Sequence, residues 1–173
     1  MRLHASIGPA RTTVSGVANE AGVQRSTVYR HFPTEVDLFG ACSQRWLSLN
    51  PPPDPGAWSE IDDPGERLGT ALGELYQWYG WAEPMLANVT RDAPLVPAME
   101  RPMREFGALL AEMHAALMRG RRERGRARRR VGAAIAHALA FETWRSLTRE
   151  GGINDGEAIG LIIGTVEAAA GSH

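Results

Sequence analysis

Apolar residues recur along most of the chain at intervals of three and four, the spacing that places them on one face of an α-helix. The segments with this pattern are residues 14–21, 25–32, 34–49, 60–80, 99–118, 131–149 and 155–170, with a short further helix expected to start at Glu83-Pro84. The sequence gives no strand signal, since no stretch alternates apolar and polar residues. The hydropathy pattern therefore predicts an all-α protein.

One segment rich in proline interrupts this pattern. Residues 50–56 read Asn-Pro-Pro-Pro-Asp-Pro-Gly, and proline removes the amide donor that a helix interior needs. We expect a domain boundary here. The division is an N-terminal helical domain over residues 1–50 and a larger helical domain over residues 57–173.

Residues 13–32 have the spacing of a helix-turn-helix. Ala18 is small enough for a second helix to cross closely, and Gly22 supplies the left-handed backbone of a tight turn. Val23 follows the turn as a core residue, while Val28 and Phe32 share one face of the second helix. The pattern predicts helices over 14–21 and 25–32, with a third helix capped by Thr34 and Asp37.

The remaining faces of the second helix carry side chains suited to a DNA major groove and its phosphates. Together with the start of the helix before it, they form the candidate DNA-binding set: Thr13, Ser15, Arg25, Ser26, Thr27, Tyr29, Arg30 and His31. Arginine pairs with guanine and a threonine methyl packs on a thymine methyl, so Arg25 and Thr27 are the candidate base readers. The alternative, a helix-turn-helix that serves packing alone, leaves this polar face without a purpose.

The strings Ala-Asn-Glu-Ala-Gly-Val over 18–23, Ser-Thr-Val-Tyr-Arg-His-Phe over 26–32 and Leu-Phe over 38–39 resemble the DNA-binding domain of TetR-family transcription regulators. The resemblance covers about residues 11–47. It implies a homodimer whose recognition helices enter successive major grooves of a palindromic operator, with Tyr29 and His31 on the phosphate backbone. It also implies a ligand-binding and dimerisation domain after residue 57.

Two features depart from that family. Glu35 stands where the family commonly has a lysine bound to phosphate, and only Arg2–Ile7 corresponds to the family's first helix. We expect the start of the natural chain to lie upstream. Without a full first helix, the apolar side chains that it normally covers should be partly exposed: Val17, Val28, Phe32 and Leu38.

Aromatic and methionine side chains gather in the second domain. The resemblance favours a pocket for a small apolar or amphipathic effector, and soft methionines suit a variable guest. The candidate pocket residues are Trp78, Trp81, Met85, Met103, Phe106, Met113, Phe141 and Trp144. A plain hydrophobic core is the alternative. By the same resemblance the last two helices would form the dimer interface, with apolar anchors Ile135, Leu139, Leu161, Ile162 and Val166.

Charge is divided unevenly around a formal net charge of −1. Residues 1–50 hold five arginines against three acidic side chains, so the basic excess lies on the candidate DNA-binding half. It is small enough that DNA binding should need a dimer. A run of arginines over 119–130 is read as a solvated helix junction, the alternative being a second nucleic-acid patch.

Other functional classes find little support. The single Cys42 excludes an internal disulfide, and no metal-ligand or nucleophile–base spacing occurs, so we expect no catalytic residues, metal or cofactor. His114, His137 and Glu142 do not share one helix face. No stretch resembles a signal peptide or a membrane span, which favours the cytoplasm and argues against a membrane partner.

The sequence is thus interpreted as a ligand-responsive DNA-binding transcription regulator, a repressor rather than an enzyme. The competing hypothesis is a dimeric small-molecule-binding protein that has lost operator binding. Glu35 and the short first helix are the features that favour the competitor.

Overall fold

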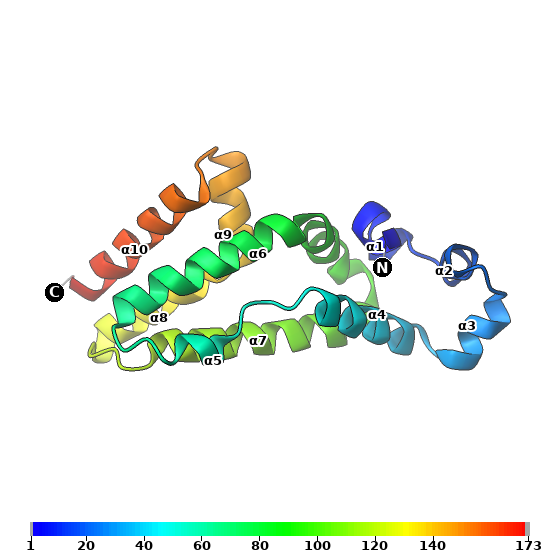
Figure 1. Cartoon of the computed structure of the whole chain (residues 1–173), viewed down its shortest axis with the longest axis horizontal. Coiled ribbons are helices and arrows are strands. Elements are labelled where there is room, and N and C mark those ends of the chain that lie inside the picture. Colours follow the sequence, from blue (N-terminus) through cyan, green and yellow to red (C-terminus); the bar gives the residue numbers. More distant parts are fainter. Residues whose placement is uncertain (1, 172–173) are drawn as a thin grey trace. The chain divides into compact units, whose positions relative to one another are not determined.

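The computed structural model describes residues 2–171, and over that range it is helical and contains no strand. The all-α prediction is confirmed. The helices of the described range are α1 (Arg2–Ile7), α2 (Val14–Ala21), α3 (Arg25–His31), α4 (Glu35–Leu49), α5 (Pro55–Trp58), α6 (Pro64–Asp92), α7 (Glu100–Met118), α8 (Gly125–Ala138), α9 (Phe141–Arg145) and α10 (Asp155–Gly171) (Figure 1). Short 3-10 turns cover Pro9–Arg11, Ala93–Leu95 and Pro97–Met99, and a π-helical turn covers Ser146–Glu150.

The chain forms two compact units. The first contains the residues up to Pro51 together with Ala82–Gly107, and the second contains Pro52–Trp81 together with the residues from Ala108 onward. The break after Pro51 falls in the proline-rich segment. The first unit nevertheless also takes in the end of α6 and the start of α7, so the functional division at residues 50 and 57 stays a prediction.

A small apolar cluster holds the helix-turn-helix together. Val14, Ala18, Val28 and Leu38 are buried from three helices, and Val17, Phe32 and Cys42 pack against them half-buried. The expectation that Val28 and Leu38 would be partly exposed is wrong, because the three helices close over these two side chains. For Val17 and Phe32 the expectation is confirmed.

Helix α1 is short but attached at several points within the first unit. Arg2 pairs with Glu20 at 2.6 Å, and the ring of His4 stacks on Phe39 with 4.9 Å between centroids. At its other end, the Asn88 side chain donates to the carbonyl of Ala5. These contacts place α1 against both α4 and the last turns of α6.

Gly8 follows α1 at a point where only glycine fits. Its backbone has φ 85° and ψ 161°, and a Cβ there would collide with the carboxylate of Asp92. That carboxylate is buried and accepts from the amide of Ala10 at 3.0 Å and from Arg91 at 2.7 Å. The hydrogen bond from Arg91 lowers the pKa of Asp92, so the acceptor stays ionised.

We expect Gly8→Ala to lower the free energy of unfolding by about 3 kcal/mol, through backbone strain and the collision with Asp92. Gly22→Ala is the matched control. Gly22 also has positive φ, at 67°, but nothing lies within 4 Å of its would-be Cβ, so we expect about 1 kcal/mol. Urea unfolding of both variants measures the difference. Equal losses would show that the contact with Asp92 contributes nothing.

Two predicted helix boundaries are wrong. The sequence predicts a helix over 60–80 and a new one at Glu83-Pro84, whereas α6 runs unbroken from Pro64 to Asp92 with Pro84 inside it. Proline removes a single amide donor, that of its own residue, and Pro84 is exposed, so the helix can continue past it.

The second error concerns residues 131–149, which are predicted to form one helix. The structure ends α8 at Ala138 and starts α9 at Phe141. Two tyrosines of α6 satisfy the carbonyls freed at this break: Tyr76 donates to Ala138 at 3.1 Å and Tyr79 donates to Leu139 at 2.6 Å. Burial raises the pKa of both hydroxyls far above the usual value, so both remain donors.

Candidate functional site

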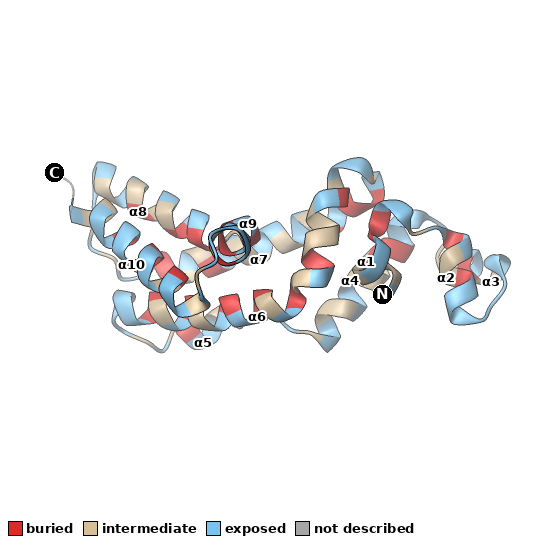
Figure 2. Ribbon diagram, turned by 90° about the horizontal axis from the view of Figure 1, so that it is seen from above, coloured by how far each residue is buried: buried red, intermediate tan, exposed pale blue. Residues whose placement is uncertain are grey.

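Helix α3 presents most of its surface to solvent. Val28 is its single buried residue and attaches it to the helix-turn-helix core. Six of the eight candidate DNA-binding side chains lie on α3, and Figure 2 shows the helix coloured mostly as exposed. Arg25, Ser26, Tyr29, Arg30 and His31 are exposed and Thr27 is half-buried. The structure therefore leaves this set accessible on one short helix.

Arg25 is oriented in the free protein by Tyr29, one helical turn away. Its guanidinium donates to the Tyr29 hydroxyl at 3.1 Å and lies over the ring at 5.3 Å from the centroid. The hydrogen bond to Tyr29 raises the pKa of Arg25, so this side chain is a permanent cation. Arg25, the predicted base reader, and Tyr29, the predicted phosphate ligand, thus contact each other in the free protein. Binding DNA would replace this contact with contacts to the base and the phosphate.

Thr13 and Ser15 stand at the start of α2, and both are exposed. The predicted cap is confirmed, since the Thr13 hydroxyl accepts from the amide of Gly16 at 3.0 Å. By contrast, the side chain of Gln24 makes no capping hydrogen bond at the start of α3. Gly22 ends α2 in the left-handed conformation that the sequence predicts.

Helix α4 begins with the predicted capping box. The Thr34 hydroxyl accepts from the amide of Asp37 at 3.1 Å, and the Asp37 carboxylate accepts from the amide of Thr34 at 3.1 Å. Glu35, the residue that departs from the family, is exposed beside them. Its charge favours the positive end of α4 and opposes an approaching phosphate.

The candidate pocket residues fall into two groups. Met85, Met103 and Phe106 line a hollow within the first unit, whereas Trp78, Met113, Phe141 and Trp144 are buried in the second. Trp81 is 58% exposed. The eight residues therefore do not form one pocket.

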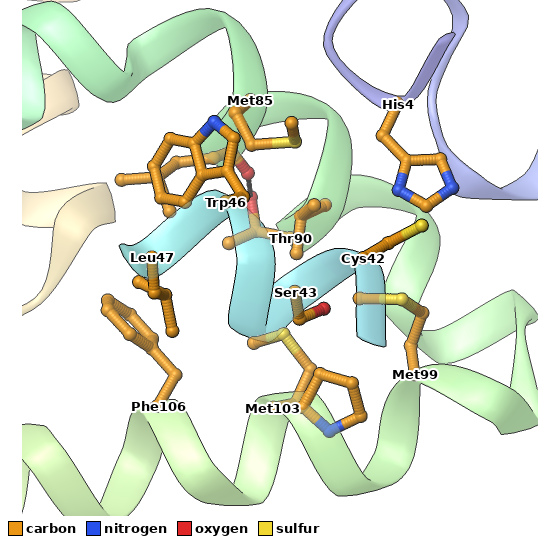
Figure 3. A pocket seen from close by; sticks show the side chains of 13 residues that line it. His4, Cys42, Ser43, Trp46, Leu47, Met85, Thr90, Met99, Met103 and Phe106 are labelled. Atoms are coloured by element: carbon orange, nitrogen blue, oxygen red, sulfur yellow. Dashed lines mark hydrogen bonds between the residues drawn. The ribbon is translucent and has the colours of Figure 1, made fainter. Parts of the chain in front are cut away.

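The hollow of the first unit has a volume of about 70 Å³ and lies among α1, α4, the last turns of α6 and the first turns of α7. Figure 3 shows its lining side chains, most of them apolar and three of them methionines. A cavity that admits benzene is roughly 150 Å³. A guest of that size would need methionine side chains to change rotamer, which their unbranched chains allow.

Sequence reasoning missed the part of this wall that comes from α1 and α4. His4, Cys42, Ser43, Trp46 and Leu47 all line the hollow. The apolar spacing of Cys42 and Trp46 along α4 was available as a signal. No such signal exists for His4, because the sequence of a six-residue helix does not indicate which distant residues its side chains contact.

The buried groups of the second unit belong to its core. Tyr79, Phe141 and Trp144 pack with ring centroids 5.4–6.0 Å apart, and Arg149 lies over Trp144. The indole of Trp144 donates to Asp155 at 2.9 Å. Each of these rings packs against other rings of the same unit.

The candidate dimer anchors are mostly buried in the chain itself. Helices α8 and α10 pack together (Figure 2), and four of the five anchors are buried. Ile135, Leu139, Ile162 and Val166 are each at most 6% exposed, whereas Leu161 is 54% exposed. Only Leu161 of this set is available to a partner.

The arginine run lies at the junction of α7 and α8. Several of its guanidinium groups donate to backbone carbonyls, as Arg121 does to Leu117 at 3.0 Å and Arg130 does to Ala169 at 2.9 Å. These hydrogen bonds connect the ends of neighbouring helices to each other.

Over residues 2–171, no group of three or more His, Cys, Asp or Glu side chains could hold a metal, and no helix is long and apolar enough to cross a membrane.

His4 is a pH-sensitive part of the first unit. Burial lowers the pKa of its imidazole from 6.5 to about 4, so it is neutral in the folded protein down to that pH. The unfolded chain takes up a proton near pH 6.5 and the folded chain does not. Stability is therefore complete above pH 6.5 and falls as the pH drops toward 4.

We expect the wild type to lose about 2 kcal/mol of unfolding free energy between pH 7 and pH 4.5 through His4 alone. The measurement is urea unfolding at the two pH values. His4→Phe keeps a ring against Phe39 but cannot titrate. Its loss of unfolding free energy between the two pH values should therefore be about 2 kcal/mol smaller than that of the wild type. An identical pH dependence in both proteins would contradict the assignment.

Residues 1–42 match the family described as "Bacterial regulatory proteins, tetR family". No match was found among curated proteins or among solved structures. The matched range contains α1, α2, α3 and the first half of α4, and so the whole exposed polar face described above. The N-terminal part of this chain is therefore similar to the DNA-binding domain of TetR-family proteins, and this match supports a TetR-type DNA-binding transcription regulator.

Proposed function

We propose that the protein is a ligand-responsive repressor that binds a palindromic operator as a homodimer. The observation that carries the proposal is the exposed polar face of α3, anchored by Val28 alone and fitted with two arginines, a tyrosine and a histidine. Arg25 and Thr27 read base edges, and Tyr29, Arg30 and His31, with Thr13 and Ser15 of α2, bind phosphates.

The effector site is proposed to be the apolar hollow of the first unit. Its position supports a regulatory role, because α4 connects the recognition helix to Trp46 and Leu47 in the wall. A guest that enlarges the hollow would displace α4 or α1. A ligand that binds better to such a conformer shifts the population away from the one that fits DNA.

Dimerisation is proposed to use the outer faces of α8 and α10. Leu161 is exposed there, with the small residues Gly164 and Ala168 on the same side of α10. Small side chains let helices of two copies approach closely. Leu161→Arg should then convert the dimer to a monomer in sedimentation equilibrium, and a dimer of unchanged stability would place the interface elsewhere.

Selection of duplexes from a random pool tests operator binding. A dimer with two recognition helices should select an inverted repeat whose half-sites lie about 10 base pairs, or a multiple of that, apart. A selected single half-site, or no enrichment at all, would contradict the proposal. No enrichment together with effector binding would favour a small-molecule-binding protein without operator recognition, the role that Glu35 supports.

A further inference from the structure

The wall of the hollow in the first unit carries no charged side chain. Its lining residues include neither a carboxylate nor a guanidinium, and most of them are aliphatic, thioether or aromatic. An ion entering this space would lose its hydration without a compensating partner. The wall therefore favours an uncharged molecule over an ion.

His4 interrupts this apolar wall. Its side chain is buried, with 7% of the residue exposed, and its ring stacks on Phe39. Figure 3 shows the imidazole directed into the hollow. Within residues 2–171 no hydrogen bond to either ring nitrogen is found, although a neutral imidazole offers one donor and one acceptor.

The ring nitrogens of His4 face the hollow without a partner from the described residues, so a ligand in the hollow can supply one hydrogen bond there in place of water. Another polar group in the wall is the Ser43 hydroxyl, which is half-buried on α4. The Thr90 hydroxyl already donates to the carbonyl of Leu86 at 2.9 Å.

We propose that the hollow binds a small uncharged molecule with an aromatic or alkyl body and one hydroxyl group, and that this hydroxyl hydrogen-bonds to the His4 imidazole. The proposal rests on the effector site proposed above and names the chemistry of its ligand. Burial also keeps the pKa of His4 low, so the ring is neutral at pH 7 and gives an anion no charge attraction.

The hollow is arranged in a way that orients such a molecule. His4 and Cys42 lie at one end, and Trp46, Leu47 and Phe106 lie at the other (Figure 3). The hydroxyl of the ligand would point to His4, and its apolar body would pack against Trp46, Leu47 and Phe106. Because His4 belongs to α1 and stacks on α4, the ligand would contact two helices of the DNA-binding unit directly.

Phenol and toluene form a matched probe pair, since they have nearly the same shape and differ by a hydroxyl in place of a methyl. Calorimetric titration of the full chain at pH 7 should give at least tenfold tighter binding of phenol. Benzoate and benzylammonium, which carry a charge on the same ring, should bind at least tenfold more weakly than phenol.

Variants identify the partner of the hydroxyl. His4→Phe keeps the stacking on Phe39 and should remove the preference for phenol, whereas Ser43→Ala should retain it. His4→Gln, which restores a donor and an acceptor, should recover part of the preference and decides the matter if the His4→Phe protein is unstable. Loss of the preference in Ser43→Ala alone would overturn the assignment to His4.

The remaining outcomes separate this inference from the proposed function. Equal affinity for phenol and toluene in the wild type would overturn the ligand class and leave an apolar effector site. Binding of neither probe would overturn both. Binding of phenol through His4 without any change in DNA affinity would support the inference and contradict the ligand-responsive function.

Discussion

Replacing Arg25 with alanine is expected to weaken binding to the selected operator by about 10- to 100-fold, because a bidentate contact from arginine to guanine contributes about 1–3 kcal/mol. Arg25 is exposed at the start of α3 and is already oriented by its hydrogen bond to Tyr29. Fluorescence anisotropy with a labelled operator duplex measures the change.

The loss at Arg25 should be specific to sequence. Binding to an unrelated duplex should weaken much less, since non-specific affinity comes from phosphate contacts. Arg104→Ala is the matched control: Arg104 is exposed on α7 and its removal takes away the same charge. We expect Arg104→Ala to change operator affinity less than twofold. A loss of equal size on both duplexes would make Arg25 a phosphate ligand and contradict its role as a base reader.

The largest effect on stability is expected at Arg67, whose side chain is 3% exposed in the second unit. Its guanidinium donates to four backbone carbonyls. They belong to Ile61 at 2.8 Å, Asp62 at 3.1 Å, Ala116 at 3.0 Å and Arg119 at 2.7 Å. The group thus ties the segment before α6 to the C-terminal end of α7, where free carbonyls favour a cation.

Arg67→Ala should lower the free energy of unfolding by about 3–5 kcal/mol, because it removes four hydrogen bonds to partly buried carbonyls and leaves a cavity where the buried side chain was. Arg67→Lys keeps the charge, but an ammonium cannot span the same acceptors, so we expect a loss of about 2 kcal/mol. Arg126→Ala, at an exposed position on α8, should cost less than about 0.5 kcal/mol. Urea unfolding decides; a loss at Arg67 no larger than at Arg126 would contradict the role of the buried guanidinium.

The parts of the fold that local residues determine could be predicted from the sequence. Gly22 and the Thr34–Asp37 capping box act within one helical turn, and the structure bounds α2 and α4 where these signals place them. The match to the TetR family likewise covers a segment whose turn and core residues are close together in the chain.

The features that depend on distant partners could not be predicted. The break between α8 and α9 is stabilised by Tyr76 and Tyr79, about 60 residues earlier in the chain, and no residue at the break itself signals it. The residues that line the hollow are spread along the chain from His4 to Phe106, so local sequence patterns cannot predict that they meet. Ile135 and Ile162 lie in segments whose apolar and small residues resemble a dimer interface, but both side chains are buried within the chain itself.

Titration of a fluorescent duplex carrying the gene's own upstream region, at two salt concentrations, tests the central claim most directly. If the face of α3 reads DNA, the protein should bind this duplex more tightly than a scrambled one. Its affinity should also fall steeply with salt as phosphate contacts release counterions. Equal affinity for the two duplexes, or no binding at low salt, would contradict the assignment of this surface to operator recognition.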